Sequence, residues 1–459
     1  MDSDRYLNCL EDFLVSPLPK SLLAAHPNDA AKPSFTLPPG WETWWNWAVS
    51  TPQPWVELLS YYAEQRPNSD IPGPLSQMID NIKALQLTRS QRLPPVPTGY
   101  GAKLHEAQYI NANTSYTQTS AKRMSPKKLH EVSAMTAHIV HLLRTSPTLK
   151  GVQHVVDIGA GRGYLSWNLR ALGMHVLALD ASDTQAKGAE RQGSYSKSSN
   201  DRGSLTYQTA KITPSTLLQL VDEWIIDLSH STAESHLPSV VFVALHACGS
   251  FTTDILRTSV SAIHGNGERR SWSLKAAIVV GCCYNMMEGK GWSPSYFTLS
   301  SSHLQLAAQV PSTWLDHQAR TEVALRKVSW RALLEATTTE SNPTDGCPTP
   351  KNRLGRVSND LYQHWEQFLQ ISSVKLCKIP IRGMEQFPEK LAMLEKRIST
   401  LHALRCLLGS CVESLIIWDR YVWLKEVSGG GRYFEAHLLN LFDQRQASGR
   451  NISITLISN

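Results

Sequence analysis

The sequence predicts an α/β fold built on an open, mostly parallel sheet with helices on both faces. Short apolar runs alternate with stretches of helical periodicity through the middle of the chain. The runs are continuously apolar, which is typical of strands buried on both faces of a parallel sheet. The first run leads directly into a glycine-rich turn and a helix, an arrangement that holds nucleotide-like ligands against backbone N–H groups.

Seven apolar runs are expected to form the sheet. Helical stretches separate most of the first five, a polar insert at residues 182–204 separates the second from the third, and a longer helix is expected over residues 411–426, just before the last two. These last two runs flank a polar connection and are expected to complete the sheet. The predicted strands are residues 154–157, 175–180, 205–211, 240–245, 276–280, 434–441 and 452–457.

The glycine-rich turn indicates which ligand the sheet holds. Asp157 ends the first run, and Gly159, Gly161 and Gly163 follow at alternate positions. A dinucleotide fingerprint would need a glycine at position 164, where this chain has Tyr164. A carboxylate beside the turn repels a pyrophosphate but attracts the ammonium group of S-adenosylmethionine. The pattern therefore predicts an S-adenosylmethionine site.

A second acid supports this prediction. Asp180 ends the second run, and an acid at about 20 residues from the turn suits a hydrogen bond to ribose hydroxyls. An ordinary strand–helix turn with packing glycines remains the alternative interpretation. Two acids at neighbouring strand ends favour the cofactor site.

A basic stretch opens the predicted sheet region. Ser125 and Pro126 are a typical start for a helix that we expect to reach Arg144. Lys127 and Lys128 lie in its first turn, where positive charges oppose the helix dipole. One use for them is to bind phosphates of a substrate or the carboxylate of the cofactor. The alternative is a solvated basic face.

The ends of the fourth and fifth strands supply the candidate catalytic residues. Ligands of open α/β sheets bind outside the carboxyl ends of the strands. His246 follows the fourth strand, where an imidazole could take a proton from the attacking nucleophile. Tyr284 follows the fifth strand as a second candidate, and Leu245 is expected to contact the cofactor. A half-buried structural histidine is the alternative interpretation of His246.

Cysteines at the same strand ends raise the question of a metal. Cys248, Cys282 and Cys283 could bind zinc together with His246. However, adjacent cysteines seldom both face one ion, and Cys-x-x-Cys and Cys-x-x-His spacings are missing. We therefore expect no metal, and we expect the cysteines to pack as small apolar groups.

Four regions are expected along the chain. Residues 1–120 form a helical, tryptophan-rich accessory region, and residues 121–300 the cofactor-binding core. Residues 301–426 form a helical insertion, and residues 427–459 the strands that complete the core sheet. The tryptophans between Trp41 and Trp55 are expected to dock a helical module, because few basic residues interleave with them. This region is also where a protein partner could bind.

Composition and charge indicate which partners and which cellular compartment to expect. The 459 residues carry a net charge of +6, which permits a polyanionic partner such as RNA without requiring one. The acidic N-terminus and the lack of a long apolar run predict neither a secretory signal nor a membrane span. Eight cysteines without disulfide spacing indicate reduced thiols and a cytoplasmic or nuclear protein.

Four motifs, at residues 124–132, 156–166, 245–249 and 281–284, together support a resemblance. They resemble the methyltransferase-like protein 25 family, also described as ribosomal RNA adenine dimethylase domain-containing. The last two are also similar, more distantly, to a tRNA ribose methyltransferase family. The resemblance covers most of residues 121–459, including further short motifs at residues 331–335, 441–443 and 450–451.

The resemblance implies a class I methyltransferase (Rossmann-like) fold and carries Asp157, Gly159, Gly161 and Gly163 over as cofactor residues. The leading hypothesis is therefore methyl transfer from S-adenosylmethionine to an oxygen or nitrogen of an RNA, such as rRNA or tRNA. A protein or small-molecule methyltransferase is a second hypothesis. A catalytically weak scaffold that binds S-adenosylmethionine and acts through interactions is a third.

Overall fold

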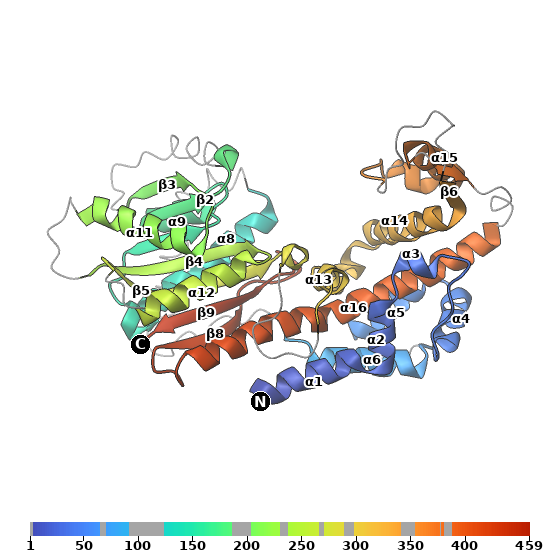
Figure 1. Cartoon of the computed structure of the whole chain (residues 1–459), viewed down its shortest axis with the longest axis horizontal. Helices are drawn as coiled ribbons and strands as arrows, with labels where there is room; N and C mark the ends of the chain where they lie inside the picture. The colour runs from blue at the N-terminus through green and yellow to red at the C-terminus, as the bar shows by residue number, and fades with distance from the viewer. Residues whose placement is uncertain are drawn as a thin grey trace. The chain divides into compact units, whose positions relative to one another are not determined.

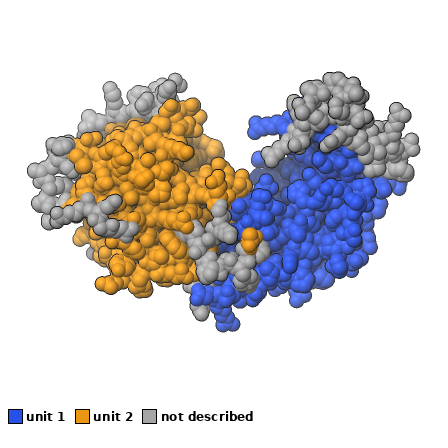
Figure 2. Space-filling model, viewed as in Figure 1, with its two compact units in different colours: residues 1–87, 299–415 blue, residues 88–298, 416–459 orange. Residues whose placement is uncertain are grey.

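The computed structural model divides the chain into two compact units. The helical unit consists of residues 1–87 and 299–415, and the sheet unit of residues 88–298 and 416–459 (Figure 2). Each unit is therefore built from two stretches that lie far apart in the sequence. The structure describes residues 3–64, 70–90, 124–185, 203–229, 237–265, 270–288, 298–340, 354–376, 378–380 and 388–459.

One sheet of seven strands organises the sheet unit (Figure 1). Its strands are β1 (His154–Ile158), β2 (His175–Asp180), β3 (Leu205–Thr209), β4 (Ser239–Cys248), β5 (Ser273–Cys282), β8 (Phe434–Asn440) and β9 (Ile452–Ser458). Their order is β3-β2-β1-β4-β5-β9-β8, and β9 alone runs antiparallel to its two neighbours. The predicted α/β sheet is thus confirmed and is consistent with a class I methyltransferase fold.

Helices cover both faces of this sheet, as continuously apolar strands require. On one face, α11 (Pro214–Ser229) and α12 (Phe251–His264) pack over a core that includes Phe242 and Trp272. On the other face, α8 (Pro126–Thr145) and α9 (Tyr164–Ala171) pack over a second core. The Ser125 hydroxyl accepts a hydrogen bond from the Lys128 N–H and caps α8, as its sequence predicts.

Two central strands are longer than their apolar runs. β4 continues past residue 245 to Cys248, and β5 continues past residue 280 to Cys282. The prediction of short strands was wrong here because polar and sulfur-bearing residues still make ladder hydrogen bonds at a sheet's edge. As a result, His246, Cys248 and Cys282 lie on strands, where β4 and β5 pair with each other as far as Cys248 and Cys282.

The helical unit brings together the two predicted helical regions. Its helices are α1 (Ser3–Val15), α2 (Pro17–Ala24), α3 (Pro27–Ala30), α4 (Glu42–Ser50), α5 (Pro54–Tyr62), α6 (Gly73–Leu85), α13 (Ser301–Ala307), α14 (Gln318–Thr337), α15 (Trp365–Leu376) and most of α16 (Pro388–Val427). The two regions pack on each other, for example where α14 contacts α3. Lys396 of α16 donates to the carbonyls of Val49 and Thr51, and Arg405 donates to that of Leu23.

The division therefore differs from the four regions expected. The last part of the expected insertion, residues 416–426, belongs to the sheet unit. A short antiparallel sheet of β6 (Thr338–Glu340) and β7 (Lys378–Pro380) also interrupts the expected helical insertion. Periodicity does not reveal strands of three residues.

The tryptophan cluster belongs to the core of the helical unit. Trp41 and Trp44 are almost fully buried, and Trp45 is 7% exposed. The Arg397 guanidinium lies over the Trp45 ring at 5.4 Å, and its Nε donates to the Trp45 carbonyl. Packing inside a helical module thus accounts for these indoles. That this module docks on the cofactor-binding core stays a prediction.

α16 is long enough to cross a membrane and is sufficiently apolar over an 18-residue window. However, 89% of that window is buried inside the protein. Helix packing therefore explains its apolar composition.

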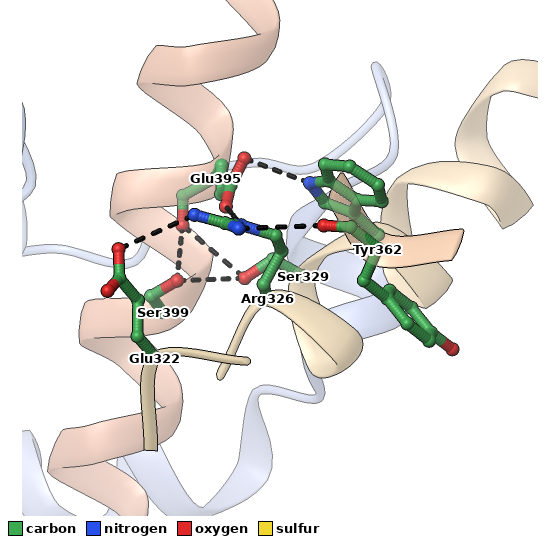
Figure 3. Close-up of polar contacts among 7 residues, drawn as sticks. Glu322, Arg326, Ser329, Tyr362, Glu395 and Ser399 are labelled. Atoms are coloured by element: carbon green, nitrogen blue, oxygen red, sulfur yellow. Dashed lines mark hydrogen bonds and ion pairs between the residues drawn. The ribbon is translucent and has the colours of Figure 1, made fainter. Parts of the chain in front are cut away.

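A polar network joins α14 and α16 inside the helical unit (Figure 3). Glu395 Oε1 accepts from Arg326 Nε at 3.2 Å, and its Oε2 accepts from Trp330 Nε1 at 2.9 Å. One turn further along α16, the hydroxyls of Ser399 and Ser329 are 2.9 Å apart. These bonds satisfy polar groups that the packing of the two helices removes from water.

Candidate functional site

The glycine-rich turn leaves β1 and enters α9. Gly159, Gly161 and Gly163 have φ angles of 76°, 57° and 71°, so all three adopt the left-handed conformation that strains other residues. The Gly159 N–H donates to the Leu179 carbonyl of β2 at 2.8 Å. The alternating glycines thus follow from backbone geometry, and they fold the turn over the carboxyl end of β1.

Two side chains hold the middle of the turn. The Gly161 N–H donates to Asp180 Oδ2 at 2.9 Å, and the Tyr207 hydroxyl donates to the Gly161 carbonyl at 2.5 Å. Asp180 Oδ1 accepts from the Ser182 N–H at 2.9 Å. Burial raises the pKa of Tyr207, so its hydroxyl stays a donor at neutral pH. The turn is therefore fixed before any ligand binds.

Asp180 keeps acceptor capacity in this arrangement. A carboxylate accepts about four hydrogen bonds, and the two backbone bonds use half of them. Its predicted contact with ribose hydroxyls stays a prediction.

Asp157 lies behind the turn and is 2% exposed. The Ser166 hydroxyl donates to its Oδ2 at 2.5 Å. Burial raises the pKa of Asp157 to about 6, although the Ser166 bond and the Lys128 charge oppose the rise. A buried acid in this state gains stability when a cation approaches, because the cation favours its ionised form.

His246 pairs with an acid that the sequence did not single out as a site residue. Glu131 of α8 is 3% exposed, and its Oε2 lies 3.0 Å from His246 Nε2. Lys128 Nζ lies 3.6 Å from the same oxygen. Burial raises the pKa of Glu131, but the His246 bond and the nearby positive charges bring it below its usual range. The ionised Glu131 thus fixes the imidazole.

The backbone at His246 is irregular. Its φ angle of 98° is rare outside glycine, and it coincides with a register shift between β4 and β5. Leu245 pairs with Val280 and Ala247 with Gly281, so His246 is an extra residue in β4. Such bulges re-aim side chains next to active sites.

Three thiols gather beside this bulge. The sulfurs of Cys248, Cys282 and Cys283 all lie within 4.8 Å of one another, and the first two are 3.4 Å apart. Hydrogen bonds from the other two thiols lower the pKa of Cys248 to about 6, whereas the hydrogen bond to Cys248 and burial raise the pKa of Cys282. Cys248 is thus the thiol of the cluster that ionises first, and Cys282 stays protonated beside it.

Tyr284 follows the thiols and is 2% exposed. The guanidinium groups of Arg420, from α16, and Arg450 each lie 5.9 Å from its ring centroid. Both arginines are less than a tenth exposed. This packing gives the buried ring a structural role, and its catalytic role stays a prediction.

The sheet brings most of the predicted site residues to one edge. Asp157, Asp180, His246 and Tyr284 all lie at or just beyond the carboxyl ends of β1, β2, β4 and β5. Leu245 lies inside β4 and is 8% exposed. Of the two predicted basic residues, Lys128 pairs with Glu131, whereas Lys127 is exposed on α8.

Several site residues carry little signal in the sequence. Glu131 is an acid in an otherwise basic helical turn, which is the one local hint of its role. Arg420 and Arg450 lie far from the site in sequence and reach Tyr284 only through the fold. Ser166 occupies a position on α9 that faces back to β1, as its bond to Asp157 shows.

Comparisons with known proteins find a methyltransferase domain in this part of the chain. Residues 127–290 match the family described as "Methyltransferase domain". The chain is also similar to the probable methyltransferase-like protein 25 of Homo sapiens, with 35% identity over 83 residues. That match covers 18% of this chain and 13% of the human protein. The glycine-rich turn, His246 and the three thiols all lie within the segment that is similar to methyltransferase domains.

Proposed function

We propose that this chain is an S-adenosylmethionine-dependent methyltransferase that acts on RNA. The observation that carries the proposal is the fixed glycine turn, with Asp180 bonded to its middle and Asp157 buried behind it. This turn lies at the carboxyl ends of parallel strands, inside a segment similar to methyltransferase domains.

The residues present fit this cofactor. The buried Asp157, whose pKa is raised, would be stabilised by the cofactor's positive charge. Asp180 would accept from the ribose hydroxyls, and Leu245 would pack against an apolar part of the cofactor. When bound, S-adenosylmethionine supplies an electrophilic methyl group on a positively charged sulfur.

His246 would prepare the acceptor for attack. With the Nε2 proton donated to Glu131, the Nδ1 atom carries the lone pair that takes a proton from the nucleophile. The carboxylate then stabilises the imidazolium that forms. Because Glu131 is buried on a helix, it holds the ring in one orientation, and orientation supplies much of the rate of such transfers.

An RNA acceptor is supported by charge and by the resemblance to RNA methyltransferase families. The net charge of +6 is compatible with a polyanion, and the exposed Lys127 offers a phosphate contact.

The test is methyl transfer to an extract from cells that lack this protein. The full chain is incubated with the extract and methyl-labelled S-adenosylmethionine, and the product is treated with ribonuclease or with protease. We expect label that ribonuclease releases and that an Asp157→Asn chain produces more slowly at the same low concentration of S-adenosylmethionine. Label released only by protease would replace RNA with a protein acceptor.

A direct titration tests cofactor binding independently of the methyl acceptor. We expect the purified chain to bind S-adenosylmethionine in calorimetry and the Asp157→Asn chain to bind it at least about tenfold more weakly. A folded wild-type chain that binds no S-adenosylmethionine would contradict the whole proposal. Binding without any transfer would instead support the scaffold hypothesis.

A further inference from the structure

We propose that Cys248, Cys282 and Cys283 form a zinc site of three thiolates, with a fourth position open to a ligand from outside the chain. This site goes beyond methyl transfer, and its existence can be tested without any activity. It arises from the positions of the three sulfurs at the ends of β4 and β5.

The bulge in β4 creates the first half of the site. Without His246 as an extra residue, Ala247 would pair with Cys282, because Leu245 pairs with Val280. The shift places Cys248 opposite Cys282, and partners in parallel strands share a face of the sheet. A backbone angle that is costly for histidine therefore sets two thiols side by side.

Cys283 completes the cluster through a second unusual angle. In an extended strand, the side chains of Cys282 and Cys283 would point to opposite faces. Cys283 instead has a φ angle of 49°, which turns its side chain back toward its neighbour. Among the described residues outside glycine, only Glu64, His246 and Cys283 have positive φ angles, and two of these three shape this cluster.

The sulfur positions match what zinc needs. Tetrahedral coordination with a Zn–S distance of about 2.3 Å places sulfurs about 3.8 Å apart. The Cys248 and Cys282 sulfurs are 3.4 Å apart, and all three lie within 4.8 Å. Small side-chain rotations would equalise these distances. Three protein ligands with one open position are typical of zinc sites that bind water or substrate.

The surroundings suit a charged metal centre with access from outside. Three thiolates and Zn²⁺ carry a net charge of −1, which the positive charge of Arg450 near Cys283 would offset. Cys248 and Cys283 are partly exposed, so an ion can reach them. Cys282 is buried against the sheet and fixes the position of the cluster.

Metal content and a cobalt spectrum test the site directly. The full chain, purified without chelators, is expected to retain about one zinc ion. After removal of the zinc, Co²⁺ should give thiolate-to-cobalt charge-transfer absorption that saturates at about one equivalent. This measurement on the wild-type chain does not depend on how any variant folds.

Three variants and a matched control assign the ligands. Cys248→Ser, Cys282→Ser and Cys283→Ser should each weaken zinc binding by more than about 100-fold in chelator competition, because outer-shell changes alone cost about 10- to 100-fold. Cys9→Ser removes a thiol that is also partly exposed but belongs to the helical unit, and should leave binding unchanged.

Two results would overturn the proposal. One is a folded wild-type chain that takes up neither zinc nor cobalt under reducing conditions. The other is a disulfide between Cys248 and Cys282 in protein taken directly from cells, because it would consume two of the three ligands. Neither result would affect the binding of S-adenosylmethionine, so the two proposals fail or succeed separately.

Discussion

At the scale of one residue, the charge of Asp157 lowers the stability of the fold but is expected to raise the affinity for the cofactor. Its carboxyl group has a pKa near 6 in the folded protein and about 4 in an unfolded chain. The folded protein therefore holds a proton that the unfolded chain releases between these pH values. Stability contributed by Asp157 is present below pH 4 and is lost as the pH rises to about 6.

Replacement of Asp157 by asparagine should raise the stability of the fold and lower the affinity for the cofactor. The amide still accepts from Ser166 but carries no charge, so the free energy of unfolding at pH 7.5 should rise by up to about 3 kcal/mol. The affinity for S-adenosylmethionine should fall in the same variant. Urea unfolding at pH 4 and at pH 7.5 provides the check, because the gain should vanish at the lower pH. An equal effect at both values would rule out the carboxyl group as the cause.

The pH dependence of cofactor binding is a second prediction from the same residue. If the ionised Asp157 attracts the cofactor, the dissociation constant should rise by up to about tenfold for each pH unit below 6. Calorimetry between pH 5 and pH 8 measures this slope. The Asp157→Asn chain should show no such slope, and a slope that persists would assign the titration to another group.

Glu131 is expected to position His246, and its substitution is expected to leave cofactor binding unaffected. Glu131→Gln removes the charge that fixes the imidazole, and a misplaced base costs about 100-fold in rate. We expect kcat to fall by this order while the dissociation constant of S-adenosylmethionine stays within about twofold. Glu435→Gln, in an exposed pair with His437, is the matched control and should change neither value.

Residues whose chemistry is local are predictable from the sequence. The glycines of the turn and the acids at two strand ends are visible because one short segment determines their backbone. Glu131 is not visible, because its partner His246 is 115 positions away and only the packing of α8 on the sheet joins them. The three cysteines and their strand ends are visible in the sequence, but the bulge in β4 and the positive φ angle of Cys283 that bring the sulfurs together are not.

At the scale of elements, the polar network between α14 and α16 should stabilise the helical unit. Glu395→Ala removes the acceptor of Trp330, which is 5% exposed, and should cost about 1–3 kcal/mol. Urea unfolding followed by circular dichroism measures the change. Glu322→Ala removes a more exposed partner of Arg326 and should cost less than about 1 kcal/mol. Equal costs would mean that the buried bond to Trp330 adds nothing.

The strands and helices of the sheet unit were predictable because their periods are clear. The strand ends were not predictable from the sequence. In β4 the apolar run ends at Leu245, whereas the hydrogen bonds of the strand continue to Cys248. The three-residue strands β6 and β7 lie below the length at which periodicity carries information.

At the scale of the molecule, an RNA substrate makes a prediction about charge. Lys127 is exposed, so Lys127→Glu should weaken RNA binding and reduce the dependence of log affinity on log salt by about one. Lys150→Glu, also exposed in the sheet unit, is the control. Fluorescence anisotropy with labelled RNA at several salt concentrations provides the measurement. An identical loss in both variants would indicate a diffuse charge effect instead of a contact at Lys127.

The pairing of distant segments has a consequence for synthesis of the chain. Residues 1–87 complete the helical unit only with residues 299–415, so the ribosome must first make the whole of 88–298. At about 5–20 residues per second, this takes about 10–40 s. During that interval Trp45 lacks Arg397, whose guanidinium lies over its ring in the folded unit. The early helices therefore wait for their partner helices while the middle of the chain is being made.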